Sequence, residues 1–478
     1  MSMESMLLAF PNRETFENTN AILARIAGAL ENGGGKVYET NFAEVNKNVN
    51  LGLGEILYPV GTEFIGYKAH TAVASVGGQN TGVTAVTINA ETFLSAIDTV
   101  DRKVKVFEYN GAWYYNGEAV SPSVYGLTLT GTPVTGDTIL VNMTCTKLVW
   151  VVRGHNHHAT VSGAKYTMTI EMKWLYGTDT AYKTLVFDAP EAFYTHESDT
   201  ALAAGTYNFN LPTTYDKWPA GSYQFTTTKT HPKNAQFCLS GNAGMAMTSL
   251  KVRIYDGGFD DTTVSEELAI TAGSGGTSLG AMGTELNHWQ RVSYGSNNNA
   301  QSNCRQFLNS TAQQGKVCKQ MTKYDRKPSW DTGTDNAYAG FLHGMGKDFL
   351  NAIATAVVSC RTNNVFEIAS LDGTAFATGQ TYELHDKVFL LSRPEIWGDW
   401  DSASLKDGTQ LEYYNGLTNL ERIKYDEFGV ARTAWVRSPY PSLAHSERTV
   451  NGATGAVYGD YAFNAIGVVA ACVIGGNQ

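Results

Sequence analysis

Hydrophobic and polar residues alternate over much of the chain between residues 70 and 271. The segments GVTAVTI, KVKVFEY, KYTMTIEMKW, GSYQFTTTKT and LKVRIYDGG place apolar or β-branched residues at every second position, as half-buried strands do. Asn110–Gly111 and Asn116–Gly117 interrupt such segments, and Asn-Gly is a strong hairpin signal. The pattern therefore predicts a mostly β protein.

Changes in this pattern divide the chain into four parts. Residues 1–69 contain a predicted helix over 12–31, which ends at Gly33, Gly34 and Gly35. Residues 70–149 read as a small β-sandwich module and residues 150–280 as a second β-rich domain with a Gly-rich linker at its end. Residues 281–478 mix helical and strand periods, which predicts an α+β C-terminal domain.

The predicted N-terminal helix carries a short apolar seam with steps of three and four residues. Its members are Phe16, Thr19, Leu23, Ile26 and Leu30. Such a seam pairs helices in a coiled coil, but an ordinary amphipathic helix shows the same spacing. Self-association through this seam and packing onto its own domain both remain open. Asn41 and Glu44 then predict a capped second helix.

Several shorter segments yield individual predictions. EILYPVGTEFIGY, VFLLSRPEIWG and the final VVAACVI read as strands, while NAETFLSAI, CRQFLNSTA and KDFLNAIATAVV read as helices. The run GSGGTSLG, Gly273 to Gly280, predicts a flexible join. It is not followed by Gly-Lys-Ser/Thr, so it does not predict a phosphate-binding loop.

Composition narrows the classes of partner. The net charge of −10 argues against nucleic acid, which needs a basic face. No apolar run reaches about 18 residues, so we expect no membrane insertion, and MSMESMLLAF lacks the features of a signal peptide. The six cysteines form no CxxC pair and predict buried free thiols made in a reducing cytoplasm.

The search for chemistry gives no catalytic constellation. His155 and His157 alternate and would share a face of a strand, but no carboxylate or cysteine completes a metal site at a suitable spacing. Carboxylates and arginines between residues 325 and 437 suit the tying of loops as well as acid–base work. We therefore predict no enzyme, no metal and no cofactor.

The stretch from Trp435 to Ile474 begins and ends like a packed strand, with a loose mixture of Tyr, His, Asn, Asp and Gly between. Together with YGSNNNAQSNCRQFLNSTA, KYDRKPSW, GFLHGMGKDFLNAI, VFLLSRPEIWG and GVVAACVI, it resembles a family of phage and prophage proteins of gut Firmicutes. Their C-terminal domain is similar to the C-type lectin fold of the formylglycine-generating-enzyme group. Many resemble target proteins of diversity-generating retroelements, the group of the phage major tropism determinant.

The resemblance implies an irregular surface inside a fixed frame. Retroelements of this kind substitute at template adenines, so an AAC codon becomes any codon ending in C, which excludes Lys, Gln, Glu, Met and Trp. The implied frame positions are Arg437, Ser438, Pro439, Pro441, Ser442, Ala444, Arg448, Val450, Gly455, Ala456, Ala462, Gly467 and Val468, with Glu447 added because it is excluded. The implied variable positions, all permitted and all expected to bind ligand, are Tyr440, Leu443, His445, Ser446, Thr449, Asn451, Tyr458, Gly459, Asp460, Tyr461, Phe463, Asn464 and Ile466.

The resemblance further implies a receptor-binding protein on the virion surface, made in the bacterial cytoplasm. Residues 1–69 would attach it to other virion proteins, and residues 70–149 would be an Ig-like insertion. Residues 281–478, with the variable region 435–474, would bind a host-surface receptor. The protein itself would be a homotrimer. One alternative is a structural head or tail decoration protein, and another is a glycan-active enzyme. The motifs of calcium-dependent sugar-binding lectins and the cysteine pair of formylglycine-generating enzymes are missing, so neither activity is carried over.

Overall fold

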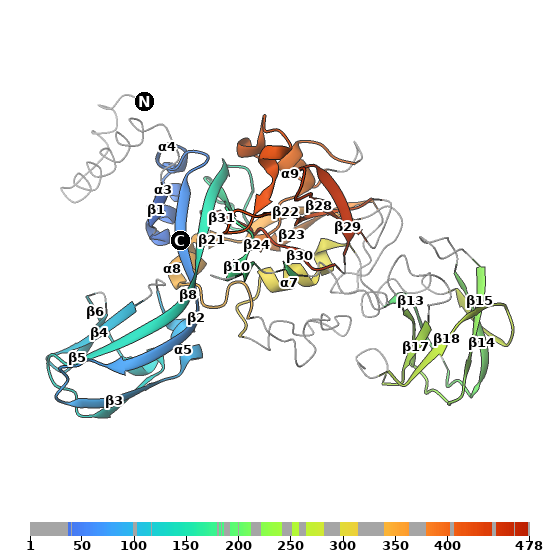
Figure 1. Cartoon of the computed structure of the whole chain (residues 1–478), viewed down its shortest axis with the longest axis horizontal. Coiled ribbons are helices and arrows are strands. Elements are labelled where there is room, and N and C mark those ends of the chain that lie inside the picture. Colours follow the sequence, from blue (N-terminus) through green and yellow to red (C-terminus); the bar gives the residue numbers. More distant parts are fainter. Residues whose placement is uncertain are drawn as a thin grey trace.

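The computed structural model consists mostly of β-strands, which confirms the predicted fold class (Figure 1). It describes residues 37–39, 41–98, 103–115, 117–178, 181–182, 184–185, 192–198, 200–211, 221–240, 251–257, 264–281, 297–313, 339–362, 379–401, 406–441, 446–462 and 464–476. The helix predicted over 12–31, with its seam, lies outside these residues. Among the described residues, no helix is long and apolar enough to span a membrane.

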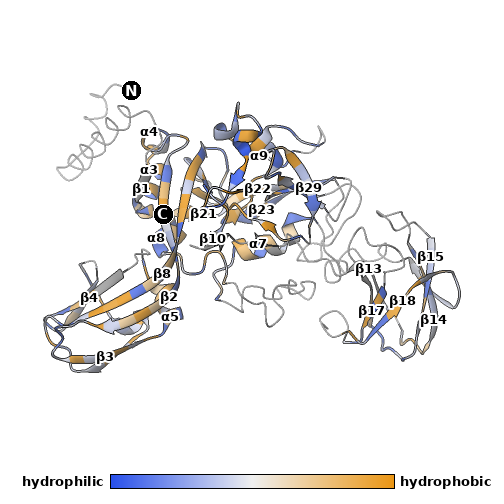
Figure 2. Ribbon diagram, viewed as in Figure 1, coloured by the Kyte–Doolittle hydropathy of each residue, from blue (hydrophilic) through white to orange (hydrophobic). Residues whose placement is uncertain are grey.

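Two long strands connect the central part of the chain with an inserted module (Figure 1). β2 (Glu63–Val76) and β8 (Thr138–His155) pair in antiparallel fashion. Burial along β8 alternates from residue 139 to 145 and is continuous from residue 148 to 154. The strand therefore has one covered face in the module and two covered faces in the central core, where Figure 2 shows its hydrophobic stretch.

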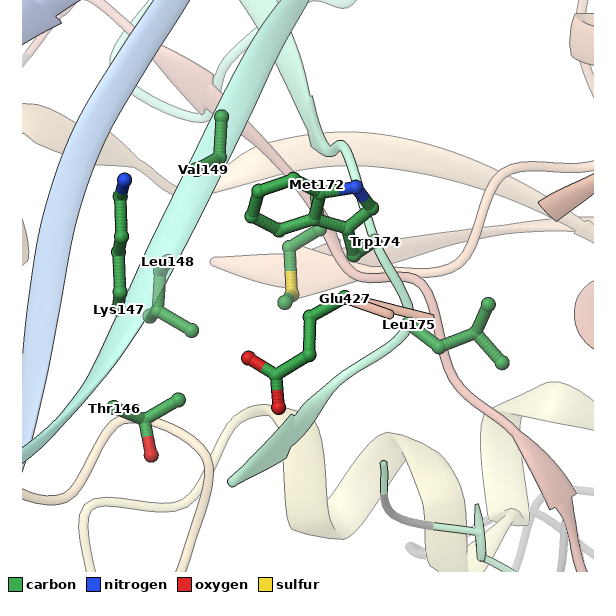
Figure 3. A pocket seen from close by; sticks show the side chains of 8 residues that line it. All are labelled: Thr146, Lys147, Leu148, Val149, Met172, Trp174, Leu175 and Glu427. Carbon is green, nitrogen blue, oxygen red and sulfur yellow. The ribbon is translucent and has the colours of Figure 1, made fainter. Parts of the chain in front are cut away.

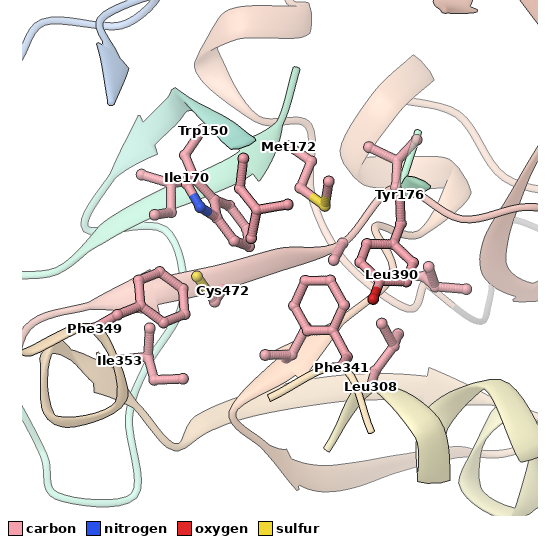
Figure 4. Packing of buried hydrophobic residues seen from close by; sticks show 14 of the residues in the cluster. Trp150, Ile170, Met172, Tyr176, Leu308, Phe341, Phe349, Ile353, Leu390 and Cys472 are labelled. Atoms are coloured by element: carbon pink, nitrogen blue, oxygen red, sulfur yellow. The ribbon is translucent and has the colours of Figure 1, made fainter. Parts of the chain in front are cut away.

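The central core joins segments that are far apart in the sequence (Figure 4). Phe42 on α3 (Phe42–Asn50) contacts Phe349 on α8 (Lys347–Ala352), with ring centroids 4.9 Å apart. Trp150 on β8 lies 5.3 Å from the same ring. The Asn41 side chain accepts a 3.2 Å hydrogen bond from the Glu44 N–H, so the predicted helix cap is confirmed. The core closes with β9 (Met168–Met172) and β31 (Ala471–Ile474), which pair with each other.

This packing does not follow the predicted domain boundaries. Residues 42–64 and 148–176 contribute to the same apolar core as residues 304–474. The described part of 1–69 and the start of 150–280 therefore pack into one core with the C-terminal part of the chain. Strand periodicity missed this because boundaries depend on long-range pairing, here of β9 with β8 and with β31.

The inserted module has its own core, formed by residues between Ala69 and Cys145. β4 (Lys103–Tyr109), β5 (Ala112–Tyr115) and β6 (Glu118–Val120) extend the sheet of β2 and β8, and β3 (Val83–Ile88) pairs with β7 (Leu127–Gly131). Asn110 and Gly111 both have positive φ, 50° and 84°, as a type I′ hairpin requires. These strands lie within the segment 70–149 for which we predicted a β module, apart from the ends of β2 and β8, and the Ig-like character of the module remains a prediction.

A separate β-rich unit spans residues 192–281. One sheet contains β13 (Ala192–Glu197), β16 (Gln236–Ser240), β17 (Lys251–Tyr255) and β18 (Glu266–Ala269). The other contains β19 (Thr271–Ala272), β15 (Gly221–Thr227), β14 (Gly205–Leu211) and β20 (Thr277–Ala281). These two sheets confirm that the β pattern continues through this part of the chain.

The Gly273–Gly280 run is not a flexible linker, contrary to our prediction. Its second half forms β20, which pairs in parallel with β14. The Asn208 side chain donates to the carbonyl oxygens of Gly275 and Gly276, at 3.1 and 3.2 Å. A Cβ atom at Gly276 would lie 1.9 Å from the Thr206 carbonyl oxygen. The glycines therefore allow a close approach of two backbones.

Three of the shorter predictions were partly wrong. EILYPVGTEFIGY begins with helix α4 (Gly54–Leu57) before β2. KDFLNAIATAVV is helical only to Ala352 and continues as β21 (Ile353–Ala354) and β22 (Ala356–Arg361). VFLLSRPEIWG has only β24 (Val388–Phe389) before α9 (Arg393–Trp397), whose Ser392–Glu395 capping box outweighs the strand-like composition.

Other local predictions were confirmed. NAETFLSAI contains α5 (Ala90–Ala96), CRQFLNSTA contains α7 (Asn303–Leu308), and the final segment forms β31. Among the cysteines whose side chains the structure describes, Cys145, Cys304, Cys360 and Cys472 are free and buried. Cys318 and the side chain of Cys238 lie outside that part.

Candidate functional site

The candidate positions that the structure describes lie on one five-stranded sheet or in the turns next to its strands. Its order is β12 (Thr184–Leu185), β30 (Ile466–Gly467), β27 (Ala434–Pro439), β28 (Ser446–Val450) and β29 (Val457–Tyr461). β27 is buried at every position, whereas β29 at the end of the order is partly exposed throughout. Burial therefore decreases across the sheet from β27 to β29, which is its accessible strand.

Arg437 on β27 anchors the base of this sheet. Its guanidinium is fully buried and forms a bidentate ion pair with Glu395, at 2.7 and 2.5 Å. It also donates to the carbonyl oxygens of Ser359, Leu390 and Asp407. Burial alone would raise the pKa of Glu395, but Arg437 and then His158 lower it well below its ordinary value.

Two further contacts hold the strand ends. The Ser438 hydroxyl donates to Asp407 at 2.6 Å and accepts from the Arg393 backbone N–H at 2.8 Å. Asn297 donates to the carbonyl oxygens of Tyr440 and Ser446, at 3.0 and 2.6 Å. These contacts fix the two ends of the segment that joins β27 to β28, whatever side chains lie between them.

The frame and candidate positions differ in exposure. Among the frame positions that the structure describes, Arg437, Ser438, Pro439, Val450, Gly455, Ala462, Gly467 and Val468 are buried, and Pro441, Arg448 and Ala456 are partly buried. Among the candidate positions, Tyr440, Asn451, Tyr458, Gly459, Asp460, Tyr461 and Asn464 are partly or fully accessible, whereas Leu443, His445 and Phe463 lie outside the described residues. Most of the described frame thus lies in the interior of the sheet.

Three candidate positions are corrected by their burial. Ser446, Thr449 and Ile466 are only 5%, 0% and 7% exposed, so their side chains do not belong to the presented surface. The rule on permitted codons did not distinguish them because it tests residue type, whereas burial depends on the segments that cover β28 and β30 in the fold.

Tyr440 lies against Arg448 of β28 and Gly459 of β29, and we call the surface formed by these three residues the aromatic patch. The Arg448 guanidinium stacks on the Tyr440 ring at 3.8 Å, and a Cβ atom at Gly459 would lie 2.6 Å from that ring. Asp401 accepts from Arg448 at 3.0 and 2.5 Å and also pairs with Arg393. Positions 440 and 459 therefore compete for one space, so a larger residue at 459 requires Tyr440 to move.

Asp460 and Asn451 stabilise the turns beside the patch. Asp460 accepts from the Tyr461 N–H at 2.9 Å and from the Asn464 side chain at 2.5 Å. Asn451 accepts from the backbone N–H groups of Ala453 and Thr454, at 2.9 and 3.0 Å. Accessible candidate positions therefore also shape the local backbone.

Glu447 lies beneath the patch and is fully buried, which agrees with its place in the frame. Among the described residues, neither of its carboxylate oxygens has a hydrogen-bond partner of normal geometry. Burial raises the pKa of Glu447 well above its ordinary value, although the Arg448 backbone N–H opposes the shift. Burial therefore favours the neutral form of this carboxyl group.

We predict that Glu447→Gln stabilises the protein. A carboxyl group with a raised pKa in the folded state weakens folding as the pH rises above its unfolded pKa of about 4.3. The variant should therefore gain about 1–2 kcal/mol in unfolding free energy at pH 7.5 and almost nothing at pH 4. Urea denaturation at both pH values measures this, and equal gains at both would contradict the neutral carboxyl group.

A groove of about 550 Å³ adjoins the other end of the sheet. Thr433, Gly452, Ala453 and Ile466 contribute to its walls with Arg432, which is tied to Asp426 at 3.1 Å. A second hollow, between β8, β9 and Glu427, measures only about 10 Å³ and holds about one water molecule (Figure 3). The groove is the larger of these two and lies beside candidate position Asn451.

The histidine cluster does not match the predicted pair. His155 contacts the Tyr58 carbonyl oxygen at 3.0 Å, while His157, His158 and Glu395 bring possible ligand atoms within 4.8 Å of one another. Burial, followed by His158, lowers the pKa of His157 to about 4. Glu395 already neutralises Arg437, and a metal ion would meet that cation, so we interpret the cluster as structural.

Sequence reasoning missed the buried network that supports β8 and β9. Glu171 accepts from Arg153 at 2.8 Å and Lys424 at 2.7 Å, and Tyr414 donates to the same carboxylate. Burial lowers the pKa of Lys424 to about 8, although Glu171 opposes the shift. The four residues come from distant segments with no common motif, so no sequence signal groups them.

Residues 265–475 match a family model described as a domain of unknown function, DUF6273. No curated protein and no solved structure matches the chain. The matched residues include β27 to β30, so four of the five strands of this sheet lie within the matched region, whereas β12 lies outside it.

Proposed function

We propose that this chain is a receptor-binding protein on the surface of a phage particle. Its C-terminal domain, which we take to be lectin-like, would present β29 and the aromatic patch to a host-cell receptor. The observation that carries the proposal is the separation of frame from surface. Every described frame position is buried or partly buried, whereas Tyr458 and Tyr461 are 57% and 38% exposed.

The accessible residues suit variable recognition. Tyrosine offers a large contact area and one polar group at low cost in side-chain entropy, and asparagine offers adaptable hydrogen bonds. The patch also contains few uncompensated charges, because Asp401 is shared by Arg393 and Arg448. Replacement of exposed side chains would leave the Arg437 anchor untouched, so binding would change without refolding.

The same arrangement argues against the enzymatic alternative. Glycoside hydrolysis needs two carboxyl groups facing a cleft. In the described part of the site, Asp401 and Glu395 are each paired with arginine and Glu447 is buried. We therefore propose non-covalent binding with no catalytic residue.

The DNA around this gene tests the proposal. We predict a near-copy of the segment that encodes residues 435–474, beside a reverse transcriptase gene. Adenines should occupy the template codons of the seven accessible candidates, whereas the Arg437 and Glu447 codons should match. The absence of any template would leave a fixed domain, for which a structural decoration role and receptor binding are about equally supported. A template that varies the frame codons would contradict the assignment of the frame.

We also propose that the chain acts as a homotrimer held to the particle by its N-terminal region and other virion proteins. Linking several copies converts weak single contacts into strong attachment. Sedimentation velocity of the full chain tests this directly, since a stable monomer would exclude it.

A further inference from the structure

β29 offers an open sheet edge beside the aromatic patch. It pairs only with β28 among the described strands. Proteins usually protect such edges with proline, lysine, a bulge or a covering segment. The sequence VYGDY contains no proline or lysine, and its register with β28 has no shift. Its one charged residue, Asp460, accepts from the Tyr461 N–H and the Asn464 side chain. The edge is therefore suited to pair with another strand.

The direction of its backbone groups follows from the neighbouring strand. The Ser446 carbonyl oxygen accepts from the Tyr440 backbone N–H at 3.1 Å, so it points toward β27 and away from β29. Since residues alternate in an antiparallel ladder, Glu447 and Thr449 bond toward β29. Their partners Asp460 and Tyr458 then bond inward, and Val457, Gly459 and Tyr461 direct their backbone groups to the open edge.

Two of these three residues offer both backbone groups. The Tyr461 N–H is taken by Asp460, and the Tyr461 carbonyl oxygen accepts from the Asn464 N–H at 2.8 Å. Val457 and Gly459 have no corresponding contact outside the β28 ladder in the described part of the chain. Their spacing of two residues matches the period at which an added strand exchanges hydrogen bonds.

Tyr458 and Tyr461 flank this edge from opposite faces of the strand, because residues of odd and even number alternate. Tyr458 is 57% exposed and Tyr461 is 38% exposed. An added strand would therefore contact one tyrosine on each face. The backbone of β29 would supply hydrogen bonds that do not depend on its side chains, and the variable side chains would determine which sequence the added strand can have.

We propose that β29 binds an extended polypeptide segment of the receptor by β-strand addition. This inference rests on the proposed receptor-binding function and names its ligand class. A polypeptide fits the edge because only a peptide backbone repeats donors and acceptors at the required period. A glycan has no such repeat.

The test uses the full chain and a displayed library of random 12-residue peptides, with a glycan array in parallel. We expect the chain to enrich peptides, and a synthetic copy of one to bind. Val457→Pro removes one outward N–H while leaving the inward ladder, and proline is tolerated on that side of an edge strand. It should weaken peptide binding at least 10-fold, whereas Val457→Ala should change it less than 3-fold.

N-methylation of the bound peptide gives a second test that needs no protein variant. Methyl groups at every second residue should abolish binding, and those between should not. Failure to enrich peptides, binding without this period of two, or glycan binding unchanged by Val457→Pro would overturn strand addition. The last result would leave receptor binding itself supported. Dimerisation lost in Val457→Pro would assign the edge to a second copy and overturn the proposal.

Discussion

Arg437→Met should destabilise the C-terminal domain by about 3–5 kcal/mol at pH 7, since removing one partner strands a buried charge. Glu395 would keep its place in the interior, with 1% of its surface exposed, but without the cation that neutralises it. The carbonyl oxygens of Ser359, Leu390 and Asp407 would also lose their donor. Urea denaturation monitored by tryptophan fluorescence measures the loss.

The loss should depend on pH with a definite sign. In the natural protein the pKa of Glu395 is lowered, so its contribution is present above the unfolded pKa of about 4.3 and fades as the pH falls. Without Arg437, burial would raise the pKa of Glu395, and folding of the variant would improve on acidification. The difference between the two proteins should therefore shrink from pH 7 to pH 4.

A double variant separates charge from packing. Arg437→Met with Glu395→Gln removes the stranded charge while retaining a side chain that can cap α9, so it should recover part of the lost stability. A single variant that loses less than 1 kcal/mol, or a loss independent of pH, would contradict the role of this ion pair as the anchor of β27.

Local patterns could be predicted from the sequence where short-range chemistry decides. The Asn110–Gly111 turn, the Asn41 cap and the strands of the inserted module all follow from neighbouring residues. The structure of the Gly273–Gly280 run does not follow from neighbouring residues, because Gly276 packs against Thr206, about 70 residues away in the sequence. Glycine signals conformational freedom and close backbone approach alike, and only the fold distinguishes them.

The candidate site shows the same limit. The resemblance grouped the residues of β28 and β29 correctly in sequence, but it could not tell Thr449, which is buried, from Tyr458, its exposed partner across the strands. Arg448 was assigned to the frame, yet it stacks on Tyr440 within the presented patch. Pairing register and edge position decide these roles, and neither is encoded in residue type.

Replacing Tyr458 and Tyr461 together by alanine should abolish most adsorption of particles to host cells while leaving the fold intact. Exposed tyrosines are common energetic centres of interfaces, worth about 2 kcal/mol or more each, so about 30-fold in affinity per residue. Surface replacements usually change stability by less than about 0.5 kcal/mol. The thermal melting temperature should therefore stay nearly constant while adsorption falls at least 100-fold.

Tyr109→Ala provides the matched control for this experiment. Tyr109 is 55% exposed, close to the 57% of Tyr458, but it lies on β4 of the inserted module. Its loss removes a similar exposed ring from a surface with no proposed role in receptor binding. Unchanged adsorption in the Tyr458/Tyr461 double variant would contradict recognition through β29, because the two rings would then not contribute to binding. An equal loss in Tyr109→Ala would contradict it as well, because affinity would then not depend on where the aromatic ring is presented.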